Sequence, residues 1–189
     1  MIHKLTAGLL AATALLAATP ARAAQPAYSL VELLAAETAP DSGGAARGFA
    51  LNGSYDIGQG FFAEGLYYHL NDDSVPGGVT SENYFLGPGY RVHTEIVDVF
   101  LSVDYLHRSV SGTGGSGTQD GYRWVWGLRS AVTDRLELNT GVEKSSVGLT
   151  DTGLRLGESY KFTDNLALRA QYVWFSDAHS WVLGLRYTY

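Results

Sequence analysis

The stretch Ser180-Trp181-Val182-Leu183-Gly184-Leu185-Arg186-Tyr187-Thr188-Tyr189 decides the fold class of this 189-residue chain. Large apolar side chains occupy its odd-numbered positions, and mostly small, polar or charged side chains occupy the even-numbered ones. Successive side chains of a β-strand point to opposite faces, so this alternation predicts a strand with one apolar face and one polar face. The aromatic side chains favour a strand as well.

The same alternation recurs from Tyr28 onward, interrupted by turn residues. It predicts ten strands, at residues 28–36, 48–57, 61–70, 82–92, 96–107, 121–132, 136–145, 152–162, 166–175 and 180–189. Tight turns at 58–60, 93–95, 133–135 and 163–165 alternate with longer connections at 37–47, 71–81, 109–119, 146–151 and 176–179. Short turns at one end and longer loops at the other are typical of an antiparallel up-and-down barrel.

One hairpin unit repeats about 30 residues apart: Val132-Thr133-Asp134-Arg135-Leu136 and Phe162-Thr163-Asp164-Asn165-Leu166. Thr and Asp suit such turns because their short side-chain oxygens can bond neighbouring backbone groups. A strand of about ten residues rises about 3.4 Å per residue, and a tilt near 40° leaves a height close to the roughly 25 Å apolar band of a membrane barrel. The strand lengths therefore fit a bilayer.

The composition supports β structure and excludes several classes of protein. The chain has 23 Gly, 12% aromatic residues, 17% charged residues and no Cys, which excludes disulfide scaffolds, thiolate metal sites and Cys nucleophiles. A formal net charge of -6 argues against a nucleic-acid partner, which would need a basic face. There is also no zinc-ligand cluster, phosphate loop or nucleophile elbow, so no cofactor is expected.

Residues 1–23 are predicted to be a secretory signal peptide, which leaves residues 24–189 as one barrel domain. Lys4 provides the positive charge, residues 7–18 are apolar, and Ala21-Arg22-Ala23 matches a cleavage site. Nothing after Ala24 is apolar for even half a helical span, so the mature chain could cross a membrane only as a closed barrel. The predicted fold class is all-β, an antiparallel up-and-down transmembrane β-barrel of about ten strands, with eight strands as the alternative.

The polar faces carry charges that alternate in sign from strand to strand. We interpret them as a charge network that neutralises and fills the lumen, because a buried ion is tolerated when it is paired and hydrogen-bonded. Glu64 shares a face with Phe62 and Leu66, so either an acid faces the lipid or large apolar side chains fill the lumen; Glu64 is expected to point inward. Glu158 lies among apolar side chains in the same way and is not assigned to a face. The predicted network consists of Glu32, Glu64, Arg91, Asp98, Asp104, Arg123, Arg129, Glu137, Glu143, Arg155, Lys161, Arg169 and Arg186.

Over residues 24–189 the chain resembles the small outer-membrane β-barrel proteins of Gram-negative bacteria, the OmpA/OmpX-like barrels. The signal-peptide pattern, the strand count and the final strand carry this resemblance. It implies a bacterial outer-membrane location after export, contact with outer-membrane lipid and lipopolysaccharide, and insertion by the barrel assembly machinery. The residues that are similar to the family's assembly signal are Trp181, Leu183, Leu185, Tyr187 and Tyr189.

We expect a non-enzymatic, monomeric barrel with a largely plugged lumen, acting in envelope integrity, adhesion or surface recognition through its long loops. No extracellular ligand can be identified from the sequence. One alternative is a narrow porin-like channel, because ten strands enclose slightly more space than the eight that side chains just fill. A soluble barrel with the charges outside is another, because the pattern alone does not say which face is interior.

A third alternative is a lipid A-modifying hydrolase. His107-Arg108-Ser109 is similar to the His-x-Ser motif of lipid A deacylases, and a base beside a hydroxyl is the minimum for nucleophilic catalysis. Val110 stands where that motif carries Asn, and the sequence places no acid to orient His107.

Overall fold

A computed structural model of the chain describes residues 25–148 and 152–189, so the predicted signal peptide lies outside the described residues. Every element in the described residues is a strand, and none of those residues forms a helix able to cross a bilayer. The strands are β1 (Leu30–Pro40), β2 (Ala46–Gly58), β3 (Phe61–Asp72), β4 (Val79–His93), β5 (Asp98–Gly112), β6 (Gly115–Ala131), β7 (Leu136–Ser145), β8 (Thr152–Lys161), β9 (Leu166–Trp174) and β10 (Ala178–Thr188).

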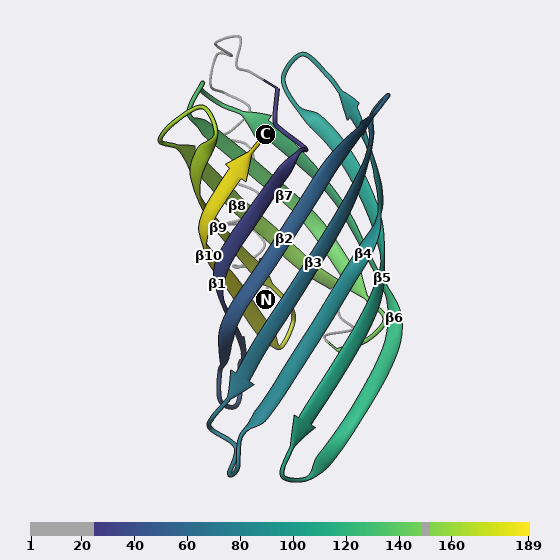
Figure 1. Ribbon diagram of the computed structural model, residues 1–189, viewed down its shortest axis with the longest axis vertical. Coiled ribbons are helices and arrows are strands. Elements are labelled where there is room, and N and C mark those ends of the chain that lie inside the picture. Colours follow the sequence, from purple (N-terminus) through teal and green to yellow (C-terminus); the bar gives the residue numbers. More distant parts are fainter. Residues whose placement is uncertain (1–24, 149–151) are drawn as a thin grey trace.

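Each strand pairs antiparallel with its neighbours in the chain, and β1 pairs with β10, so the sheet closes into a barrel (Figure 1). The predicted fold class, with ten strands rather than eight, is confirmed. Closure places Glu32 of β1 opposite Arg186 of β10, and Leu33 opposite Leu185. The contact between β1 and β10, called here the seam, therefore continues the alternation of faces without a break.

The short turns are held by threonine side chains. The Oγ1 atoms of Thr94, Thr133 and Thr163 accept hydrogen bonds from backbone N–H groups three residues later, at 3.1, 2.9 and 3.0 Å. The turn between β2 and β3 is built differently, with positive φ angles at Gly58, Gln59 and Gly60. All four turns lie at the same end of the barrel, called here the short-turn end; the opposite end is the loop end.

The three long connections at the loop end are shorter than predicted, and the prediction of a loop at 109–119 is wrong. β5 continues to Gly112 and β6 begins at Gly115, so these residues form a hairpin that projects beyond the wall (Figure 1). The other two long connections shrink to residues 41–45 and 73–78. The part of β5 and β6 inside the barrel wall fixes the register of the pair. Backbone hydrogen bonds then continue the pairing beyond the wall, even though both faces are polar there and no apolar alternation marks a strand.

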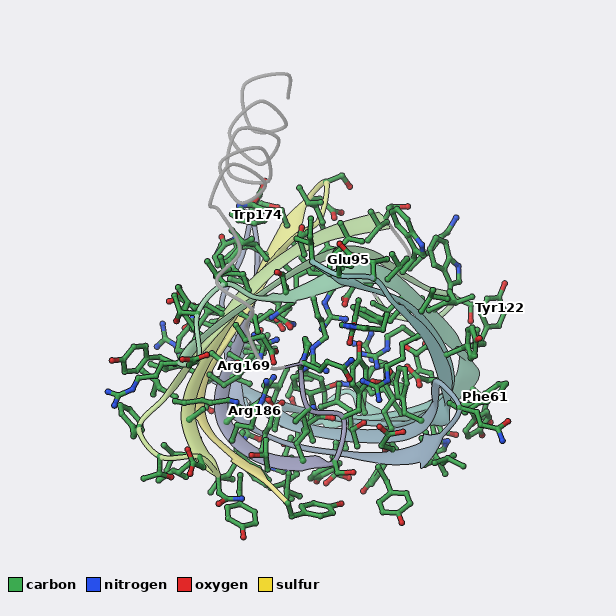
Figure 2. All side chains as sticks on the ribbon, turned by 90° about the horizontal axis from the view of Figure 1, so that it is seen from above. Phe61, Glu95, Tyr122, Arg169, Trp174 and Arg186 are labelled. Carbon is green, nitrogen blue, oxygen red and sulfur yellow. The ribbon has the colours of Figure 1, made fainter. Side chains whose placement is uncertain are left out.

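Most of the exposed large side chains on the outer face are apolar, whereas most of the buried polar side chains in the lumen are charged. Leu33, Leu86 and Leu185 are 60%, 68% and 49% exposed, whereas Asp98 and Asp104 are 0% exposed. Figure 2 shows Arg169 and Arg186 within the ring and Phe61 and Tyr122 outside it. This distribution is the reverse of that of a water-soluble protein.

The interior also contains an apolar cluster on the wall formed by β1, β2, β3 and β10. Its buried members are Leu34, Ala36, Ala50, Leu70 and Val182. The conflict in β3 is resolved because large apolar side chains and Glu64 both point into the lumen. Glu158 lies on the other side of the wall: it is exposed on the outer face, opposite Leu138 and Ala170.

Candidate functional site

The lumen near the short-turn end is crossed by a layer of paired charges. Arg186 donates from Nε to Oε1 of Glu32 at 2.6 Å and from Nη1 to Oε1 of Glu137 at 2.9 Å. Arg129 Nη2 donates to both carboxylate oxygens of Glu137, at 2.8 and 3.0 Å. Arg169 Nε lies 3.6 Å from Glu32 Oε1. Because Glu137 is on β7 and Arg186 on β10, their bond spans strands that are not neighbours.

A second cluster joins β3, β5 and β6. Arg123 donates to Oδ2 of Asp104 from Nε at 2.9 Å and from Nη2 at 2.6 Å, and it reaches Glu64 Oε1 at 3.3 Å. Ser102 Oγ donates to the same Glu64 oxygen at 2.7 Å. The Arg123 guanidinium also lies 4.3 Å from the centre of the Phe85 ring, where a cation is attracted to the ring face.

A third cluster surrounds Arg91 at the short-turn end. Arg91 pairs with Asp56, and its Nη1 lies 3.5 Å from Asp98 Oδ2. The Tyr28 ring lies between the guanidinium groups of Arg91 and Arg129, at 4.2 and 4.4 Å. Burial raises the pKa of the Tyr28 phenol to about 12, so this group stays neutral at ordinary pH. Asp56 was missed by the sequence analysis, although it has the inward parity of Asn52 on the same strand.

The remaining charges of the predicted network behave in two ways. Arg155 lies 3.5 Å from Glu143, and Gln171 Oε1 accepts hydrogen bonds from Arg155 and Arg169 at 2.7 and 2.6 Å. Lys161 makes no ion pair within residues 25–148 and 152–189. It sits at the end of β8, where the strand turns back at the short-turn end. Its inclusion in the network therefore stays a prediction.

Cavities remain in the lumen beside the charge network. A cavity of about 380 Å³ lies toward the loop end, and one of about 100 Å³ lies toward the short-turn end. Tyr68, Gln171 and Val182 line both cavities, so these three side chains form the boundary between them.

The outer face carries a His–acid pair near the loop end on each of two hairpins. His107 Nδ1 lies 2.7 Å from Asp120 Oδ1, and His69 Nδ1 lies 3.3 Å from Glu82 Oε1. The acid that the sequence analysis could not place beside His107 is therefore Asp120. It was missed because it lies directly after the stretch predicted to be a loop, whereas in β6 it pairs in register with His107.

The residues of the predicted assembly signal form one outward row along β10 and the residue that follows it. Leu183, Leu185 and Tyr187 are exposed, Trp181 Nε1 donates to Glu37 Oε1 at 3.0 Å, and the backbone N–H of Tyr189 donates to Ser29 O at 3.2 Å. No group of three His, Asp or Glu side chains in the part of the chain that the structure describes is arranged to hold a metal ion.

The fold and the lumen define this protein as a ten-stranded antiparallel β-barrel with an apolar exterior and an ion-paired interior, the fold that the resemblance implied. No family model and no curated protein matches the chain. Among solved structures, the translocator domain of the autotransporter NalP from Neisseria meningitidis is 14% identical, covering 85% of this chain and 87% of that one, with a TM-score of 0.48.

The N-terminal β-barrel domain of Pseudomonas aeruginosa OprF is 13% identical, covering 87% of this chain and 100% of that one, with a TM-score of 0.45. Ail, the attachment invasion locus protein of Yersinia pestis, is 16% identical, covering 85% of this chain and 95% of that one, with a TM-score of 0.39. These likenesses concern the fold alone, so function has to be derived from this chain's own residues.

Proposed function

We propose that this protein is an integral outer-membrane β-barrel with a largely plugged lumen, and that it acts without catalysis in envelope integrity, adhesion or surface recognition. Its partners in this role are outer-membrane lipid, lipopolysaccharide and, during insertion, the barrel assembly machinery. Recognition falls to the loop end, where connections 41–45 and 73–78 and the tip of the β5–β6 hairpin are exposed.

The observation that carries this proposal is the sorting of the two faces. A closed barrel satisfies its own backbone hydrogen bonds, which is the condition for crossing hydrocarbon with strands. Its outer face consists of large apolar side chains with aromatic groups toward both ends, as at the two interfaces of a bilayer. In a water-soluble barrel the charged side chains would lie on the outer face and the apolar side chains in the interior.

Spin labels on the outer face test the membrane location. Labels at Leu101, Leu128 and Leu183 in the protein reconstituted into lipid vesicles are expected to be accessible to oxygen and shielded from a water-soluble nickel chelate. A label at Ser116, on the exposed hairpin tip, provides the aqueous control. If the three outer labels were open to the nickel chelate, as at Ser116, the membrane proposal would fail.

A second candidate function, a lipid A acyl hydrolase, is favoured by the contact between His107 and Asp120. An acid on Nδ1 orients the imidazole and leaves Nε2 free to act as a base. Ser109 follows His107 on the same outer face; within the described residues no hydrogen bond joins the two side chains. In this reaction the Ser109 hydroxyl would attack an acyl ester, His107 would pass its proton to the leaving alcohol, and water would then release the fatty acid.

Mass analysis of lipid A separates the two candidates. The non-enzymatic proposal predicts unchanged lipid A in cells that express the protein. The hydrolase predicts the loss of one acyl chain, abolished by His107→Ala, Ser109→Ala or Asp120→Asn. His69→Ala is the matched control, because it removes an equivalent His–acid pair that has Asn71, rather than Ser, two residues later.

A further inference from the structure

The cavity at the loop end of the lumen is a space that the ion-paired network does not fill. Every strand except β8 contributes to its lining, mostly through side chains of the inner face. Its volume of about 380 Å³ falls within the range of roughly 300 to 1,000 Å³ that is usual for small-molecule sites. The space is therefore large enough for a small organic ligand.

Much of the cavity wall is apolar. Leu106, Val173 and Val182 are buried in the lumen, and Phe85 adds an aromatic ring. Polar uncharged side chains, including Ser81 and Asn83, interrupt this wall. Apolar walls with a few polar groups are typical of sites that take a mainly apolar ligand and fix its orientation through one end.

Arg108 supplies the one charge in this lining that lacks a counter-ion among the described residues. The two other charged residues of the lining are neutralised: Arg123 is bonded to Asp104, and Glu143 lies 3.5 Å from Arg155. The Nε of Arg108 is buried without a hydrogen-bond partner. A buried donor without an acceptor is unfavourable, and a guanidinium is well suited to bind a carboxylate through two parallel hydrogen bonds.

We propose that this cavity binds a small amphipathic carboxylate, whose charged end pairs with Arg108 and whose apolar body lies against Leu106, Phe85 and Val182. The ligand class follows from the combination of an apolar wall with a single uncompensated cation at one side. This site lies inside the barrel, so it goes beyond recognition by the exposed loops and does not depend on it.

Equilibrium dialysis of labelled phenylacetate against the folded protein in a non-ionic detergent tests the proposal, with micelles alone as the blank. Phenylacetate is expected to bind, and its neutral counterpart phenylacetamide to bind more weakly. Arg108→Gln is expected to reduce the affinity at least about tenfold, since it removes a charge-assisted pair. Arg47→Gln, which removes an exposed outer arginine at the same end of the barrel, is expected to leave binding unchanged.

A second variant tests the apolar part of the site. Ala46→Phe places a ring in the cavity from the beginning of β2 and keeps Arg108, so it is expected to weaken phenylacetate binding as well. Each variant is first checked for the electrophoretic shift of a folded barrel. Unchanged binding in Arg108→Gln, or inorganic phosphate competing as well as unlabelled phenylacetate does, would overturn the proposal.

Discussion

Arg186 shows how a single residue can determine the stability of the lumen. Its guanidinium is buried and bonded to both Glu32 and Glu137, so replacing it leaves two buried carboxylates short of a partner. We predict that Arg186→Met lowers the free energy of unfolding by about 3 to 5 kcal/mol, measured by urea titration in detergent with tryptophan fluorescence.

Two further variants identify the cause of this loss. Adding Glu32→Gln to Arg186→Met is expected to recover part of the stability, since it removes one of the two buried carboxylates that have lost the Arg186 guanidinium. Arg135→Met, in an exposed short turn, is expected to have almost no effect. A double variant less stable than the single one would mean that Arg186 acts mainly by packing.

At Gly184, where β10 pairs with β1 at the seam, there is no room for a larger side chain. A Cβ at this inner position would lie 2.1 Å from the backbone oxygen of Leu33 and 2.7 Å from the Cα of Leu34. We predict that Gly184→Ala destabilises the barrel by about 1 to 3 kcal/mol, in the same urea titration. Gly53→Ala is the matched control: its Cβ would meet only Val31, at 3.9 Å, so stability should be kept or slightly raised.

At this scale the sequence predicts which face a side chain occupies but not what it touches. Arg123 and Glu137 could be placed in the lumen because strand parity repeats every two residues. The bond between Arg186 and Glu137 could not be predicted, since it joins non-adjacent strands and depends on how far side chains reach within the closed ring. Arg108 was overlooked in the His-x-Ser motif, although it shares the inward parity of Asp98 and Asp104.

At the scale of elements, apolar alternation predicts a strand only where one face is apolar. The wall segments of β5 and β6 satisfy that condition, and their predicted positions are close to the observed ones. Residues 111–120 are all exposed and are either polar or glycine, so the sequence contains no apolar alternation there. These residues are paired because the β5–β6 pairing, whose register is set inside the barrel wall, continues into them. The His107–Asp120 pair depends on this extension and was missed for the same reason.

The outward row on β10 supports a prediction about assembly. If the barrel assembly machinery reads this row, replacing Tyr187 and Tyr189 by Ser should sharply lower the folded, heat-modifiable fraction in cells. Refolding of the purified variant into detergent should change little, because both side chains are exposed on the outer face. Replacing Tyr55 and Tyr90 by Ser removes the same number of exposed outer tyrosines from other strands and is the control. An equal loss in both double variants would indicate a general membrane-anchoring effect.

At the scale of the whole molecule, the side chains that fill the closed barrel determine whether solutes can pass. Contacts from Arg123 to Glu64 and from Arg186 to Glu137 join strands that are not neighbours in the barrel. These contacts connect strands across the lumen. They fill the additional interior space that a ten-stranded barrel has compared with an eight-stranded one. Tyr68, which lines both cavities, adds an uncharged barrier between them.

We therefore predict no steady single-channel steps when the protein is inserted into a planar bilayer, with detergent alone as the blank. Tyr68→Ala combined with Val182→Ala removes most of the shared boundary and is expected to give small currents, because it connects the two cavities without disturbing an ion pair. Uniform steps in the unmodified protein, lost on Arg123→Gln and Arg129→Gln, would instead make the lumen a conducting pathway whose arginines attract anions, and the porin-like alternative would replace the plugged barrel.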